Sequence, residues 1–310
     1  MKLPKRLLLA AALSAPLLTH AADPARCDVV RFADVGWSDI TVTTAVTRQV
    51  LTELGYRTRV KRLSVPDTYK ALQAKQIDVF LGNWMPSMEG DIRPYQENGT
   101  VEILGANLEG AKYTLAVNQE AFDGGLRSFA DIAKFKDKLG GKIHGIEPGN
   151  DGNKLIQQMI DDNAFALGDF KLVESSESRM LAQVRLAAHL KRWVVFLGWE
   201  PHPMNNQVKL RYLSGGDQYF GPNYGGATVY TNIRAGYASE CPNVARLLKN
   251  LRFSLAMENH LMEAILDQNT NRRREAIAWL KANPETQAQW LQGVTSRDGG
   301  ALPPLLAQQP

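Results

Sequence analysis

Residues 28–82 read DVVRFADVGWSDITVTTAVTRQVLTELGYRTRVKRLSVPDTYKALQAKQIDVFLG. In this stretch, runs of β-branched and aromatic residues alternate with segments whose apolar residues recur at helical spacing. We expect strands at Asp28–Val35, Thr58–Leu63 and Ile77–Gly82, and helices at Thr41–Leu54 and Pro66–Lys75. Because a helix between two strands returns the chain to the edge where the first strand began, this order predicts a parallel sheet flanked by helices.

The same order of elements returns further along the chain. We expect strands at Tyr113–Val117, Gly141–Gly145, Lys171–Glu174 and Trp193–Gly198, and helices at Asp151–Asp162 and Ser178–Lys191. The two series also share letters, because DVFLGNWMP (78–86) and VVFLGWEP (194–201) are each an apolar run followed by Gly, Trp and Pro. The sequence therefore predicts an α/β fold with two lobes and a cleft between them.

The remainder of the chain begins with a Gly-rich loop, 212–226, which we interpret as a hinge or rim. A short strand at Ala227–Thr231 follows, and then mostly helix from Pro242 to Val294. We expect the first lobe to comprise residues 22–110 and 212–310, and the second lobe, 111–211, to be an insertion reached by two crossing strands.

Residues Met1–Ala21 have the features of a secretory signal peptide: Lys2, Lys5 and Arg6, then the apolar run Leu7–Leu18, then small residues at a cleavage site. The run is shorter than the roughly 20 residues that span a bilayer. Removal of this segment takes away three positive charges and no acid, which lowers the formal net charge from +4 to +1. We therefore expect a periplasmic protein that binds neither nucleic acid nor anionic membrane. Our hypothesis for its oligomeric state is a monomer.

Two cysteines remain, Cys27 and Cys241. In an oxidising compartment an even number of cysteines favours one disulfide, which would bring the segment after Cys241 back onto the first lobe. The residues before Cys27 do not form the small-residue box of a lipoprotein, so no lipid anchor is expected.

Ligands of open α/β sheets bind beyond the carboxyl ends of the strands, and three tryptophans are expected in loops at such positions, Trp37, Trp84 and Trp199. Several aromatic faces around one cavity attract a cation, and a quaternary ammonium fits best because it has no N–H to donate. Asp39 could supply a counter-charge or accept a hydrogen bond from a ligand hydroxyl. It could also cap the helix that follows it, a role compatible with ligand binding, and Asn150 has the same two interpretations.

Other chemistries have weaker support. The sequence lacks GxxxxGK[ST], HExxH and GxSxG, and His202 has no metal-ligand partner at a fixed spacing, so we expect no cofactor and no metal. Trp193, Trp279 and Trp290 are interpreted as core residues. A hydrolase that uses Asp39 and Glu200 as paired carboxylates remains an alternative, as does a structural or adhesion module.

Six motifs together resemble one family: VGWSDI (35–40), VFLGNWMPSM (79–88), AKYTLAV (111–117), EPGNDGNKL (147–155), FLGWEPHPMN (196–205) and YFGPNYGGATVYTN (219–232). The chain resembles periplasmic choline-binding proteins, the substrate-binding components of ABC importers related to glycine-betaine binders. This resemblance implies a two-lobed type II binding-protein fold with a disulfide, no catalysis, and delivery of choline to a membrane permease. It also implies a cage of Trp37, Trp84, Tyr113 and Trp199, with Asp39 and Asn150 near the ligand hydroxyl.

The charges of the expected binding loops favour choline over glycine betaine. Those loops carry Asp39, Glu147, Asp151 and Glu200 but no lysine or arginine. A betaine carboxylate needs donors, so acidic loops disfavour it, although helix N-termini could still bind it. Betaine, carnitine and acetylcholine therefore remain alternatives within the class.

Overall fold

The computed structural model describes residues 22–266 and 270–302, so the expected signal peptide lies outside the described residues. Its strands are β1 (Val29–Asp34), β2 (Arg57–Arg62), β3 (Val79–Met85), β4 (Val101–Asn118), β5 (Lys142–His144), β6 (Lys171–Val173), β7 (Val195–Glu200), β8 (Leu210–Tyr212) and β9 (Gly226–Arg234). The α-helices are α1 (Ser38–Glu53), α2 (Val65–Gln73), α3 (Glu89–Glu97), α4 (Gln119–Asp123), α5 (Lys136–Leu139), α6 (Asp151–Asp161), α7 (Glu177–His189), α8 (Met204–Gln207), α9 (Asp217–Phe220), α10 (Pro222–Gly225), α11 (Tyr237–Glu240), α12 (Pro242–Asn250), α13 (Leu255–Leu266), α14 (Arg272–Ala282) and α15 (Pro284–Trp290). Short 3₁₀ turns cover Ala25–Cys27, Phe129–Phe135 and Ala164–Ala166.

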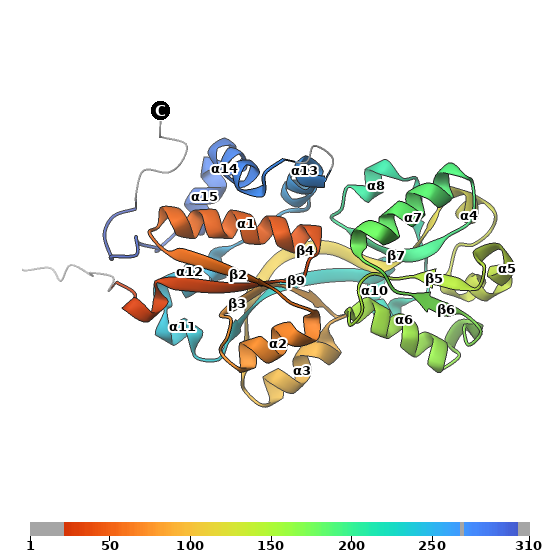
Figure 1. The fold of residues 1–310 in the computed structure, drawn as a ribbon, viewed down its shortest axis with the longest axis horizontal. Coiled ribbons are helices and arrows are strands. Elements are labelled where there is room, and N and C mark those ends of the chain that lie inside the picture. The colour runs from red at the N-terminus through yellow and green to blue at the C-terminus, as the bar shows by residue number, and fades with distance from the viewer. Residues whose placement is uncertain (1–21, 267–269, 303–310) are drawn as a thin grey trace, which may run out of the picture.

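The strands form one curled sheet in the order β2-β1-β3-β9-β4-β7-β5-β6, with β8 paired to β4. Pairing is parallel between β1 and its neighbours and between β5 and its neighbours, as the strand–helix alternation predicts. Figure 1 shows two lobes, the first built on β1–β3 and the second on β5–β7, with helices on both sides of each. The predicted α/β architecture with two lobes is confirmed.

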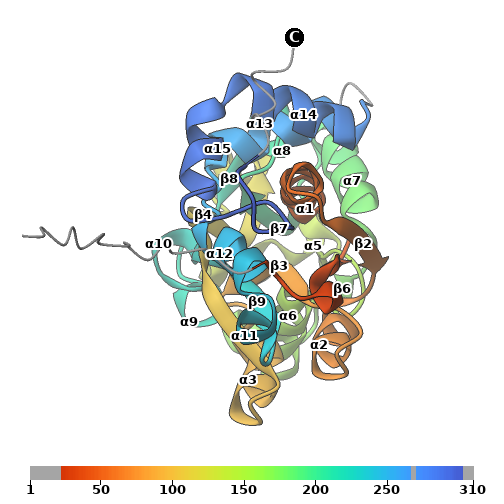
Figure 2. The same cartoon turned by 90° about the vertical axis from the view of Figure 1, so that its left-hand side faces the viewer.

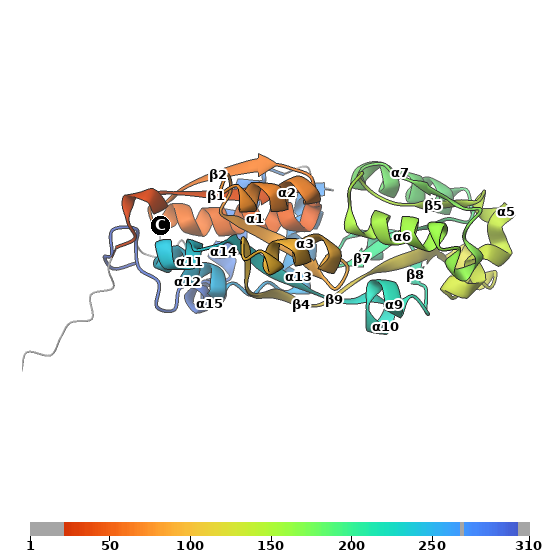
Figure 3. The ribbon, with the colours of Figure 1, turned by 90° about the horizontal axis from the view of Figure 1, so that it is seen from below.

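Strands β4 and β9 pair with each other antiparallel and run from one lobe into the other (Figure 3). We expected only Tyr113–Val117 of β4, yet the strand begins at Val101. Its pairing with β9 is interrupted by three register shifts, between Ile103 and Ala111. Such irregularities break the alternation of inward and outward side chains, which is why the pattern did not predict this half of the strand.

Local sequence explains where several helices begin. The Ser64 hydroxyl accepts the backbone N–H of Asp67 at 3.2 Å and Pro66 lies in the first turn of α2. The Ser176 hydroxyl caps α7 in the same way, accepting the N–H of Arg179 at 3.3 Å. Each cap satisfies one of the backbone donors that a helix start leaves free.

The C-terminal helices return to the first lobe, where α13 and α14 lie over α1 (Figure 2). Trp290 is 1% exposed and stacks on Trp279 at 5.8 Å between ring centroids, so the prediction that both belong to the core holds. The Gly-rich loop 212–226 contains two single-turn helices, α9 and α10, rather than open loop throughout. No helix within the described ranges is long and apolar enough to cross a membrane.

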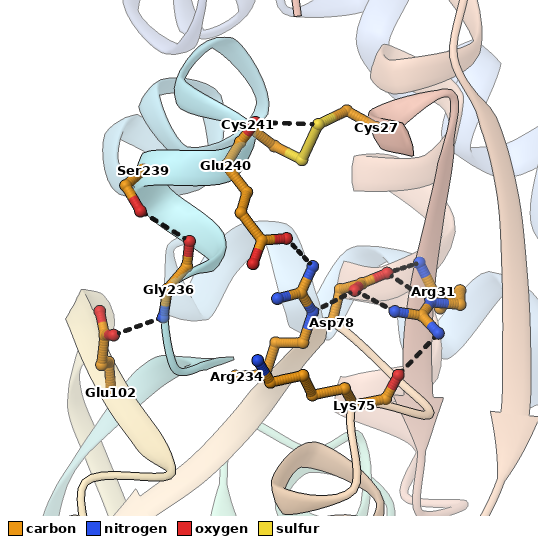
Figure 4. A network of polar contacts seen from close by, with 10 residues as sticks. All are labelled: Cys27, Arg31, Lys75, Asp78, Glu102, Arg234, Gly236, Ser239, Glu240 and Cys241. Atoms are coloured by element: carbon orange, nitrogen blue, oxygen red, sulfur yellow. Dashed lines mark hydrogen bonds and ion pairs between the residues drawn. A yellow bond between two sulfur atoms is a disulfide. The ribbon is translucent and has the colours of Figure 1, made fainter. Parts of the chain in front are cut away.

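The predicted disulfide joins Cys27 to Cys241 across 214 residues. Beside it, Asp78 is 2% exposed and accepts hydrogen bonds from Arg31 and Arg234, while Arg234 also pairs with Glu240 at 2.6 Å (Figure 4). A buried carboxylate needs such partners, because removing one would leave an uncompensated charge. This network therefore ties β1 and β9 to the residue that precedes β3, at the end of the first lobe.

Candidate functional site

A cavity lies between residues of the two lobes. Its lining consists of Trp37, Asp39, Trp84, Tyr113, Ile146, Asn150, Asp151 and Trp199. The structure thus brings together all six residues that the sequence and the resemblance nominated. Each lining side chain belongs to a residue at most 6% exposed, so a ligand here would be nearly surrounded by protein.

Two of the tryptophans lie in strands rather than in the loops we expected. Strand β3 continues to Met85 and includes Trp84, and β7 continues to Glu200 and includes Trp199. Both strands are held to their ends by antiparallel neighbours, since Trp84 pairs with Val229 of β9 and Trp199 with Tyr113 of β4. The loop prediction was therefore wrong by a few residues, while the position at the carboxyl end of each strand was correct.

The rings approach one another from both lobes. The centroids of Trp84 and Tyr113 lie 6.0 Å apart with their planes tilted by 57°. Tyr113 also packs edge to face against Phe220, with 5.9 Å between the ring centroids, and this contact restricts the orientation of its ring. Four aromatic side chains line this one cavity, so the arrangement can bind a cation through cation–π attraction.

Asp39 is not a helix cap. Helix α1 begins at Ser38, with Trp37 at the N-cap position, so Asp39 lies inside the first turn and the cap alternative is wrong. Its Oδ2 accepts the indole N–H of Trp84 at 3.1 Å, and its Oδ1 is buried with no hydrogen-bond partner among the described residues. Burial, reinforced by the negative charge of Glu177, raises the pKa of Asp39 to about 7.

Asn150 does cap α6, as one of its two interpretations predicts. Its Oδ1 accepts the N–H of Asn153 at 3.1 Å and the hydroxyl of Tyr113 at 2.9 Å, which occupies both lone pairs. Its Nδ2 donates to Oδ1 of Asp151 at 3.1 Å. Asn150 therefore orients a ring and a carboxylate of the cavity through its own hydrogen bonds.

Asp151 is the lining residue that sequence reasoning placed only among acidic loop residues. Its Oδ2 is buried without a hydrogen bond among the described residues. Burial raises the pKa of Asp151 to about 7, against the opposing effect of the nearby Ser87 hydroxyl. The signal that could have found it is its position directly after Asn150, in the first turn of the same helix.

Two other acids of the expected loops do not line the cavity. Glu200 lies 3.2 Å from Nζ of Lys112, so the carboxylate pair of Asp39 and Glu200 that a hydrolase would use is not assembled. Oε1 of Glu147 accepts the indole N–H of Trp37 at 2.6 Å. Within the described ranges no cluster of three or more His, Cys, Asp or Glu side chains could hold a metal ion.

Comparison with solved structures identifies close relatives. An ABC-transporter choline binding protein in complex with choline is 58% identical, with 92% of this chain and 98% of that chain covered and a TM-score of 0.89. The unliganded semi-closed form of such a protein, also 58% identical, covers 89% of this chain and 96% of that chain with a TM-score of 0.83. These matches confirm the type II binding-protein fold.

A curated relative of unassigned function, an uncharacterized protein ORF1 of Chromohalobacter salexigens, is 55% identical over 138 residues, which are 44% of this chain and 89% of that protein. Residues 28–282 match the model of the substrate binding domain of ABC-type glycine betaine transport systems. Proteins of that kind act outside the cytoplasm, where they bind a small ligand and interact with a permease. The chain belongs to this family of substrate-binding domains of ABC importers.

Proposed function

We propose that this protein binds choline in the cavity between its lobes and delivers it to the permease of an ABC importer. The observation that carries the proposal is the cavity itself, in which four aromatic rings surround a space that two buried carboxylates also line. A choline complex of a 58% identical relative supports the same conclusion.

The energetics of such a cage suit a quaternary ammonium. Cation–π attraction contributes about 0.5–2 kcal/mol per ring, so four desolvated rings supply up to about 8 kcal/mol. A micromolar dissociation constant corresponds to about −8 kcal/mol. The methyl groups of choline need no acceptors, and its hydroxyl can donate to the free Oδ1 of Asp39 or the free Oδ2 of Asp151.

Glycine betaine is the alternative ligand within the family. Its carboxylate would lie among acidic groups, because no lysine or arginine is among the eight described residues that line the cavity. Two carboxylates around the ligand's tail would repel it or have to carry protons. The charge of the lining therefore favours choline over betaine.

The remaining features of the proposal follow from the sequence. We infer that Met1–Ala21 is a cleaved signal peptide and that the mature protein works in the periplasm as a monomer, without catalysis and without nucleic acid. Residues 22–110 and 212–310 make up the first lobe and 111–211 the second. The lobes close around the ligand because it has a higher affinity for the closed arrangement.

Calorimetric titration with choline and with glycine betaine tests this function. The protein is first unfolded and refolded to remove any ligand retained from the host. We expect micromolar or tighter binding of choline and much weaker binding of betaine. Equal or reversed affinities would contradict selection by the acidic lining, and no binding of either would contradict the cage. Incubation with acetylcholine should give no hydrolysis.

A further inference from the structure

The first turn of α1 is held from the opposite lobe by two carboxylates. Glu147, in the loop between β5 and α6, accepts the indole N–H of Trp37 at 2.6 Å. Glu177, the first residue of α7, accepts the backbone N–H of Ser38 at 3.0 Å and also the Ser38 hydroxyl. Trp37 and Ser38 belong to the first lobe, so both contacts exist only when the lobes are together.

The Glu177 carboxylate is itself positioned by a buried histidine. Nδ1 of His202 accepts the N–H of Met204 at 3.0 Å, which assigns the proton of the neutral ring to Nε2. Nε2 lies 3.4 Å from Oε1 of Glu177, and His202 is 2% exposed. The histidine therefore steadies the carboxylate from within the second lobe.

The same group of residues also contacts two rings of the cage, one from each lobe. The imidazole of His202 packs edge to face on Trp199 at 5.0 Å between ring centroids, and Glu147 bonds directly to Trp37. Neither glutamate lines the cavity. One ring from each lobe is thus oriented by groups that do not contact the ligand space.

We propose that Glu147 and Glu177 form a clamp that stabilises the closed arrangement of the lobes and holds Trp37 at the ligand space. The inference rests on the proposed function and adds how the bound ligand is retained. Hydrogen bonds to charged acceptors are about twice as strong as neutral ones, and here they are made only on closure. Loss of the clamp lowers the closed population and so weakens the apparent affinity in proportion.

If the clamp retains the ligand, its loss should change the dissociation rate of choline rather than the association rate. Stopped-flow fluorescence would give the choline association and dissociation rates of the wild type and of Ser38→Ala, Glu177→Gln and the double variant. We expect Glu177→Gln to raise the dissociation rate about tenfold and to change the association rate less than about twofold. Adding Ser38→Ala should change little more, because its hydroxyl has already lost the charged acceptor. The matched control is Glu263→Gln, which removes an exposed carboxylate of α13.

An unchanged dissociation rate in Glu177→Gln, or full additivity in the double variant, would overturn the clamp. A wild type that does not bind choline would contradict the proposed function and leave the clamp to a second measurement. For that measurement, spin labels at Lys70→Cys and Gln183→Cys, both exposed and on opposite lobes, report the distance between the lobes without ligand. The clamp requires longer distances in Glu177→Gln than in the wild type, and identical distributions would overturn it.

Discussion

At the scale of single residues, the cavity combines apolar aromatic rings with buried carboxyl groups. The rings of Trp37, Trp84, Tyr113 and Trp199 are apolar and offer only diffuse negative potential, while Asp39 and Asp151 are carboxyls whose ionised forms are penalised by burial. A bound cation suits both kinds of side chain, because the rings attract it and its charge compensates the buried carboxylates.

Removal of one ring should weaken binding without unfolding the protein. Trp199→Ala deletes one cation–π partner and the apolar area that it covers, so we expect choline affinity to fall about 10- to 100-fold, as one ring is worth about 0.5–2 kcal/mol before its lost area is added. Titration calorimetry gives the affinity and circular dichroism reports the fold. Trp199→Phe keeps an aromatic face and should recover part of the loss. Wild-type affinity in Trp199→Ala would exclude this ring from the site.

Choline affinity should depend on pH near neutrality. The pKa values of Asp39 and Asp151 are raised from 3.8 to about 7, so both carboxyls are largely protonated below that pH. A bound cation favours the ionised forms, and binding should therefore weaken as the pH falls, about tenfold between pH 8 and pH 6 if one proton must leave. Calorimetry in buffers of different ionisation enthalpy should also detect proton release.

The stability of the ligand-free protein should depend on pH in the opposite direction to the choline affinity. Because folding raises these two pKa values, the folded chain holds protons that the unfolded chain has lost, and the contribution of both groups to stability decreases as the pH rises from about 4 through 7. Asp39→Asn should reduce the pH dependence of the choline affinity and the pH dependence of the stability. A choline affinity that is constant from pH 6 to pH 8 would show that neither carboxyl titrates on binding.

At the scale of elements, the site depends on how closely α6 approaches β4. Gly152, in the first turn of α6, lies against the ring of Tyr113: a Cβ there would be 2.2 Å from the tyrosine hydroxyl oxygen and 2.7 Å from Cζ. The absent side chain lets the tyrosine reach Asn150 and still line the cavity. Helix α6 thus positions the Tyr113 ring in two ways. Gly152 leaves room for the ring, and Asn150 at the N-cap accepts the hydrogen bond of its hydroxyl.

A pair of glycine variants separates this steric effect from helix propensity. Gly152→Ala should push the Tyr113 ring from its place and weaken choline binding at least about tenfold, because a misplaced ring loses both its cation–π and its packing contribution. Gly90→Ala, in the first turn of α3, meets no atom within 4 Å. It should leave affinity unchanged and raise stability by about 0.5–1 kcal/mol. Calorimetry and chemical unfolding measure the two quantities, and equal affinities in both variants would contradict the steric role of Gly152.

At the scale of the whole molecule, continuous strands join the two lobes. The disulfide joins two segments of the first lobe that are far apart in the sequence. Strands β4 and β9 carry the sheet across the cleft, so the lobes can rotate only as these strands bend. The Cys27–Cys241 bond lies instead at the outer end of the first lobe, beside the Asp78 network (Figure 4). Closure and covalent stabilisation are therefore separate in space.

Removal of the disulfide should lower stability and spare binding. The bond closes a loop across 214 residues, and loss of such a bond costs about 2–5 kcal/mol, mainly through the entropy of the unfolded chain. Cys27→Ala/Cys241→Ala should therefore unfold at lower guanidinium concentration while the folded protein keeps its choline affinity. Guanidinium titration with and without reductant measures the first effect and calorimetry the second. An affinity loss in the folded double variant would show that the two ends of the lobe are coupled.

Local patterns in the sequence were sufficient to predict the parallel strands, the disulfide and the placement of three tryptophans at or just beyond the carboxyl ends of strands, because each depends on residues near in the chain or on the number of cysteines. Tyr113 as a cavity residue came only from the family resemblance. Four features emerged only from the folded chain: Asp39 inside α1, Glu200 drawn to Lys112, the free oxygen of Asp151, and the contacts of Trp37 and Ser38 with Glu147 and Glu177. Those contacts join residues 110 and 139 positions apart. They depend on strand register and on how two lobes meet, which no local periodicity encodes.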